Sequence, residues 1–136
     1  MGSKRPIVRL GSWIVPVLVG GTVLASYGLA KTVRFPTQTV VVEDRRISPG
    51  ATPAVVEFTV RNLKCWTMSG LFTDRMTEEP GVLEIVTFVR TNTARITYDP
   101  SRTSPERLTD AIERPIENPE TGETARVFVV KEARVF

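Results

Sequence analysis

Residues with a wide chemical repertoire are few in this sequence. It contains one cysteine, Cys65, and no histidine. An intramolecular disulfide, a Ser-His-Asp triad and a histidine-ligated zinc or haem site are therefore excluded. The carboxylates Glu78 and Glu79, and Asp99 with Glu106, stand at turns and helix ends, where capping or solvated roles are usual. The sequence therefore predicts a protein that is not an enzyme.

The basic charge is concentrated at the N-terminus. Residues 1–34 contain five of the 18 Lys and Arg residues and none of the 15 acidic ones, so residues 35–136 carry a net charge of −2. These basic residues flank an apolar segment and form no stripe of the kind that binds nucleic acid. A nucleic-acid partner is therefore not expected.

The apolar segment, residues 10–30, has the length of a membrane span. It contains no charged residue, and as a helix it covers roughly 30 Å, the thickness of a bilayer's hydrocarbon core. Trp13 and Tyr27 lie near its two ends, where amphipathic rings favour the membrane interface. A signal peptide cleaved after Ala30 is the alternative, but the apolar run is longer than a usual signal sequence. We therefore expect a single transmembrane helix.

The positions of the basic residues also predict an orientation. Three basic residues lie in 1–9, and two follow the apolar segment. By the positive-inside rule, 1–9 is cytoplasmic and the rest of the chain lies outside the cytoplasm. We therefore expect a bacterial inner or intracytoplasmic membrane protein with a periplasmic C-terminal domain.

Small residues form a stripe on one face of the predicted helix. Gly21, Ala25 and Gly28 recur at the i, i+4 and i+7 positions. Such a stripe lets the backbone of another helix approach closely, although Gly is common in membrane helices generally. We expect this face to contact integral membrane subunits.

The remaining chain has strand and helix periodicities in turn. Residues 31–54 are expected to be an extended linker whose β-prone run, 39–42, could add an edge strand. Over residues 55–130 the sequence predicts an α+β, ferredoxin-like βαββαβ fold, with a four-stranded antiparallel sheet and two helices on one face. The last strand is expected at 125–130, followed by a tail at 131–136. The expected core consists of Val56, Phe58, Val60, Leu71, Phe72, Ile85, Ile96, Leu108 and Ile112.

Four separated segments of this domain form motifs. They are 62–68 (NLKCWTM), 79–82 (EPGV), 94–100 (ARITYDP) and 104–113 (SPERLTDAIE). In order and spacing they resemble the metal loop, the turn before the second strand, the third strand and the second helix of the heavy-metal-associated family. This resemblance implies a ferredoxin-like fold and a Cu(I) or similar soft ion held by two cysteine thiolates on the loop before the first helix.

The metal loop departs from that pattern. Cys65 stands at the first thiolate position, but Met68 fills the second, and Lys64 adds a repelling positive charge. In one interpretation the loop no longer binds metal and Met68 packs inward; in another, Cys65 and Met68 form an altered Cu(I) site, since a thioether is also a soft ligand. A third makes Cys65 a redox-reactive or intermolecularly paired thiol. We favour the first and expect no cofactor.

Two functions follow from these observations. The first is a non-catalytic accessory subunit of a larger respiratory or photosynthetic membrane complex. The second is a membrane-tethered periplasmic chaperone or sensor for a soft metal such as Cu(I). We favour the accessory subunit because it accounts for both the missing second cysteine and the small-residue stripe.

Overall fold

The computed structural model describes residues 34–42 and 46–136. Residues Phe35–Phe136 form one compact unit, distinct from Met1–Arg34. No helix within the described ranges is long and apolar enough to cross a membrane. The predicted span at 10–30, with Gly21, Ala25 and Gly28, lies outside these ranges.

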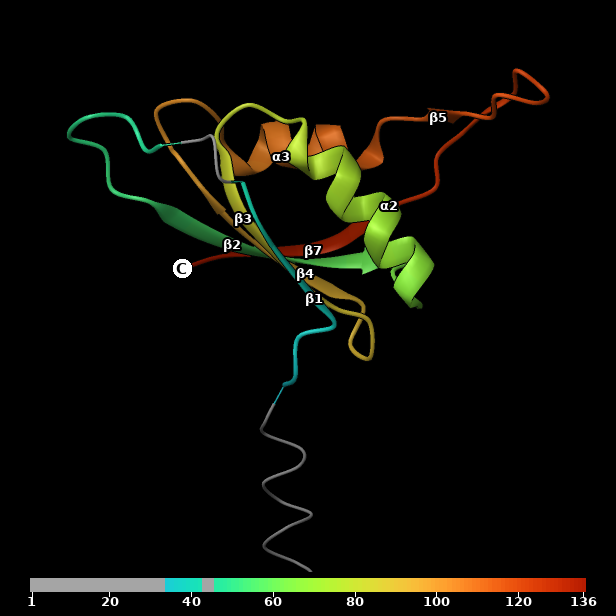
Figure 1. Cartoon of the computed structure of the whole chain (residues 1–136), viewed down its shortest axis with the longest axis horizontal. Helices are drawn as coiled ribbons and strands as arrows, with labels where there is room; N and C mark the ends of the chain where they lie inside the picture. The colour runs from blue at the N-terminus through green and yellow to red at the C-terminus, as the bar shows by residue number, and fades with distance from the viewer. Residues whose placement is uncertain (1–33, 43–45) are drawn as a thin grey trace, which may run out of the picture. The chain divides into compact units, whose positions relative to one another are not determined.

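An antiparallel sheet forms the framework of the compact unit (Figure 1). Its strands lie in the order β1-β3-β4-β2-β7, and every neighbouring pair is antiparallel. The bounds of these strands are β1 Gln38–Val41, β2 Ala54–Arg61, β3 Val82–Phe88, β4 Thr93–Tyr98 and β7 Val129–Val135. With helices after β2 and β4, the unit is an α+β domain whose arrangement is consistent with the ferredoxin-like fold.

Two helices cover one face of this sheet, as Figure 1 shows. Helix α2 spans Trp66–Thr77 and helix α3 spans Pro105–Glu113. The start of α3 follows the local sequence as predicted. Ser104 has extended backbone and its side chain accepts a hydrogen bond from the Arg107 N–H, while Pro105 occupies the first turn. Both features stabilise a helix N-terminus because the first N–H groups have no partner within the helix.

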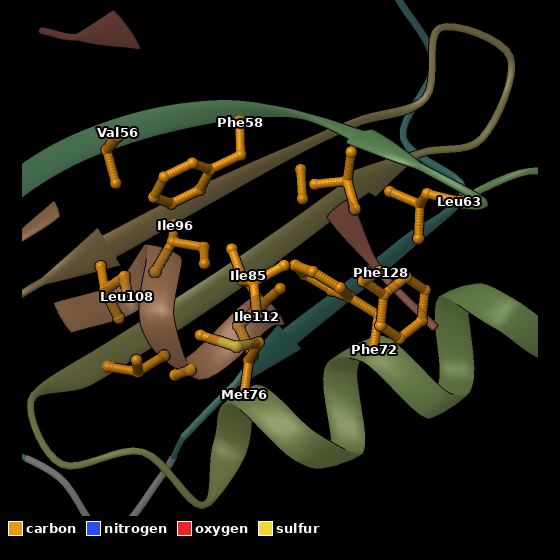
Figure 2. Packing of buried hydrophobic residues seen from close by; sticks show 14 of the residues in the cluster. Val56, Phe58, Leu63, Phe72, Met76, Ile85, Ile96, Leu108, Ile112 and Phe128 are labelled. Carbon is orange, nitrogen blue, oxygen red and sulfur yellow. The ribbon is translucent and has the colours of Figure 1, made fainter. Parts of the chain in front are cut away.

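The core lies between the helices and the sheet (Figure 2). Phe58 of β2 and Ile96 of β4 are fully buried, and the rings of Phe72 and Phe128 meet edge to face with centroids 5.4 Å apart. All but one of the expected core residues are buried. Leu71 is the exception, with 38% of its surface exposed. The buried residues of α2 are instead Ser69, Phe72, Thr73 and Met76.

The sheet has five strands where the sequence predicted four. The additional strand is β1, which pairs along the outer edge of β3 and overlaps the β-prone run 39–42 of the expected linker, the run from which an added edge strand was expected to be possible. A buried polar contact helps to fix it: the Ser69 and Thr87 hydroxyls lie 2.6 Å apart, and Ser69 Oγ donates to Gln38 Oε1 at 3.0 Å. These groups satisfy one another where unpaired polar atoms would be costly, so α2, β3 and β1 are joined.

The last strand lies later in the chain than expected. Strand β7 occupies Val129–Val135, and Ala133 pairs with Phe58 of β2. The expected start of this strand instead contributes to a two-stranded hairpin, β5 (Ile116–Glu117) with β6 (Thr124–Ala125). The sequence near its end contains two overlapping β-prone stretches, 125–130 and 129–135. Pairing with β2 makes the second of them the strand of the sheet. Residues 131–135, expected to be a tail, therefore belong to the sheet.

Candidate functional site: the loop between β2 and α2

The loop that resembles a metal-binding loop has a compact backbone. Asn62 adopts a positive φ of 72°, and its carbonyl accepts a hydrogen bond from the Lys64 N–H at 2.9 Å. The Asn62 side chain donates to the Val127 carbonyl at 2.7 Å, which attaches the loop to the segment before β7. Leu63 is fully buried. The hydrogen bonds of Asn62 and the burial of the Leu63 side chain in the core thus fix the conformation of the loop.

Its two sulfur-containing residues lie in different environments. Cys65 is the N-cap residue of α2; its thiol is free and exposed, and its side chain makes no capping hydrogen bond. Met68, in the first turn of α2, is partly buried and packs against the hydrophobic core. This burial of Met68 confirms the inward packing expected from the sequence. The Met68 side chain thus contributes to packing, and the one thiol lies at the surface.

The charges around Cys65 give no anionic support for a cation. Lys64 is exposed, and no acidic residue occurs between Arg61 and Leu71. Within the described ranges, no group of three or more Cys, Asp or Glu side chains is arranged to hold a metal ion. Soft ions are held by several sulfur ligands, with thiolates the stronger ones. The described residues thus supply one exposed thiol, with Met68 engaged elsewhere.

The start of α2 also presents an aromatic residue that the sequence interpretation did not single out. Trp66 follows Cys65 and is 64% exposed, and Phe35, just before β1, is 74% exposed. Trp66 belongs neither to the buried residues of α2 nor to a repeating apolar pattern. That departure from the core spacing is the signal that would have marked it as a surface residue.

A shallow cleft lies between the C-terminal half of α2 and the segment after α3. Arg75 lines it and donates a hydrogen bond to the Arg114 carbonyl, while the Arg114 side chain forms an ion pair with Glu79 at 3.0 Å. Burial lowers the pKa of Arg75, and the nearby Arg114 charge lowers it further against the opposing effect of Glu79. Because these polar groups join α2 to the end of α3, the cleft is best explained as a structural contact.

A second polar cluster lies at the end of the sheet where β4 ends and β2 begins. The Asp99 carboxylate accepts hydrogen bonds from the Ser101 hydroxyl at 2.6 Å, the Ser101 N–H at 2.9 Å and the Ser48 N–H at 2.8 Å. Hydrogen bonds from Ser101 and Ser48 hold the pKa of Asp99 well below its usual range, although burial acts in the other direction. This carboxylate therefore remains charged and joins the segment before β2 to the turn after β4, a structural role.

Comparison with known proteins concerns the fold. No protein-family model and no curated protein matches the sequence. The chain is similar to the crystal structure of oxidized MerP from Ralstonia metallidurans CH34, with 20% sequence identity and a TM-score of 0.43. This similarity covers 60% of the present chain and 100% of the MerP chain.

Proposed function

We propose that this protein is a single-pass, membrane-anchored, non-catalytic accessory subunit of a larger bacterial membrane complex, respiratory or photosynthetic. Its N-terminus is cytoplasmic, and its α+β domain acts in the periplasm as a docking module. The observation that carries the proposal is that the Cys65 thiol is exposed while Met68, at the position of the family's second thiolate, is partly buried against the core. A domain that resembles a metal-binding family but has one thiol where the family has two is better suited to binding protein than to carrying metal.

The predicted membrane helix supplies the second contact in this proposal. Its stripe of Gly21, Ala25 and Gly28 fits a close approach by a helix of the host complex. The test is purification from native membranes in mild detergent, followed by identification of co-migrating subunits. Gly21→Leu should reduce co-migration, whereas Val23→Leu, on the opposite face of the predicted helix, should not. Equal co-migration of both variants would refute the role of the stripe. If the wild-type protein migrated without any other subunit, the accessory role would be refuted.

A soft-metal chaperone is the second candidate because the Cys65 thiol is exposed and unused as a helix cap. A Cu(I) competition titration of the full chain in detergent, wild type against Cys65→Ser, distinguishes the two functions. We expect weak binding in both proteins. Tight one-to-one binding that disappears in Cys65→Ser would establish the chaperone function instead.

A further inference from the structure

One end of the α+β domain combines basic and aromatic side chains. It is formed where β1 begins, β2 ends, α2 begins and the β3–β4 turn lies, toward the lower right of Figure 1. We call it the basic end and define it by the exposed residues Phe35, Arg61, Lys64, Trp66 and Arg90. Its three segments, 35–38, 61–67 and 88–93, contain no acidic residue.

Two hydrogen bonds hold these three segments together. The Val60 N–H donates to the Asn92 carbonyl at 2.7 Å, which joins the end of β2 to the β3–β4 turn. The Val89 N–H donates to Thr37 Oγ1 at 3.0 Å, which joins the end of β3 to the segment before β1. The basic end is therefore a fixed feature of the fold.

The charge distribution distinguishes this end from the opposite one. Within the described ranges, Arg61, Lys64 and Arg90 form no ion pair with an acidic side chain. The opposite end, formed by the α2–β3 turn, the segment between β4 and α3 and the first turn of α3, contains charges of both signs: the acidic residues Glu78, Glu79, Asp99 and Glu106 and the basic residues Arg102 and Arg107. Among the described residues, the basic end therefore differs from the opposite end because its exposed charges are all positive and are not balanced by acidic side chains.

The short connection between the predicted span and the domain brings the basic end close to the membrane. Only residues 31–34 separate the predicted span at 10–30 from Phe35, and strand β1 begins at Gln38. Even when fully extended, four to five residues reach no more than about 18 Å. If the span is inserted, Phe35 is held near the bilayer surface, where Trp side chains favour the interface. Anionic phospholipids in that leaflet would attract Lys and Arg, as they do at other membrane surfaces.

From these observations we propose that the basic end docks on the anionic phospholipid surface of the membrane that holds the anchor. Arg61, Lys64 and Arg90 meet headgroup phosphates, and Trp66 enters the interface. This inference rests on the membrane anchor of the proposed function and adds an orientation: the start of α2, with Cys65, faces the lipid. At about fivefold per basic residue, loss of all three charges should weaken docking on the order of a hundredfold.

The two tryptophans of the chain permit a direct test, since Trp13 lies in the predicted span and Trp66 at the basic end. The full chain carrying Trp13→Phe is reconstituted in nanodiscs whose lipids bear a quencher near the headgroup. We expect Trp66 emission to be quenched in discs containing phosphatidylglycerol, and much less in discs of phosphatidylcholine alone. High salt should relieve the quenching, because salt screens surface charge.

Charge variants provide the matched control. Arg61→Gln, Lys64→Gln and Arg90→Gln together should abolish the quenching, whereas the same change at Arg46, Arg102 and Arg107, which are exposed away from the basic end, should preserve it. Equal behaviour of the two triple variants would overturn the proposal. So would unquenched Trp66 on anionic discs, which would leave the basic end to an acidic protein partner.

The second tryptophan separates failure of docking from failure of the anchor. In a Trp66→Phe protein, quenchers placed in the acyl chains should quench Trp13 in both kinds of disc. Quenched Trp13 with unquenched Trp66 would refute lipid docking alone. Unquenched Trp13 would refute the anchor, and the docking proposal with it.

Discussion

Replacement of Phe72 by alanine tests the packing of α2 most sharply. The Phe72 side chain is 1% exposed and lies edge-on to the ring of Phe128. Its truncation should cost about 3–5 kcal/mol, which includes the lost aromatic contact. Leu71, its neighbour on the same helix, is 38% exposed. Leu71→Ala should cost about 1 kcal/mol, because only part of that side chain is removed from water.

Hydrogen exchange of the full chain in detergent can measure this difference, since the most protected amides report the free energy of global unfolding. For the central strands β2 and β4, Phe72→Ala should raise the exchange rate by roughly two to nearly four orders of magnitude, and Leu71→Ala by less than one. Similar rates in the two variants, or a larger effect of Leu71→Ala, would show that the helix packs through a different face.

Three further predictions concern turns and caps. Gly81→Ala should destabilise the domain by about 1–3 kcal/mol in thermal unfolding, because the φ of Gly81 is +85° and an added Cβ would lie 3.0 Å from the Thr103 side chain. As a control, Gly70→Ala in α2 should not be destabilising, because there is open space around Gly70. Since the pKa of Asp99 is lowered by folding, its contribution to stability is present near neutral pH and declines progressively as the pH falls below about 4. Asp99→Asn should therefore lower the melting temperature at pH 7 and flatten the fall of the melting temperature in acid. Ser104→Ala should cost about 1 kcal/mol and speed amide exchange at the start of α3, and unchanged exchange there would argue against the cap.

Local sequence signals were sufficient for much of the domain. Ser104-Pro105 fixed the start of α3 because both residues act within one helical turn. Strand β2 was recognisable because Val56, Phe58 and Val60 alternate with residues on the other face, and all three are fully buried. Where a short-range rule determines the structure, the sequence was enough.

The structure departs from the sequence predictions where contacts between residues far apart in the sequence determine the packing. The helical spacing of apolar residues in α2 predicted that Leu71 is part of the core. In the structure, Ser69 faces inward because it hydrogen-bonds to Gln38 of β1 and Thr87 of β3, and Leu71 lies at the surface. Similarly, 125–130 and 129–135 are both β-prone, and the partner β2 selects the second. The lipid-facing role proposed for the basic end depends on three segments that only the fold brings together. No local pattern contains that information.

The metal loop offers the last test, because one substitution can restore what the resemblance implies. Met68 lies beside the buried stripe of α2, where its long side chain reaches the core; a cysteine at that position is too short to pack as deeply. Met68→Cys should therefore cost the domain about 1–2 kcal/mol of packing while placing a second thiol three residues after Cys65. In a Cu(I) competition titration its affinity should exceed that of the wild type by several orders of magnitude, and Met68→Leu should bind no better than the wild type. An unchanged affinity in Met68→Cys would mean that something other than the missing thiol, such as the Lys64 charge or the rigid loop backbone, prevents metal binding.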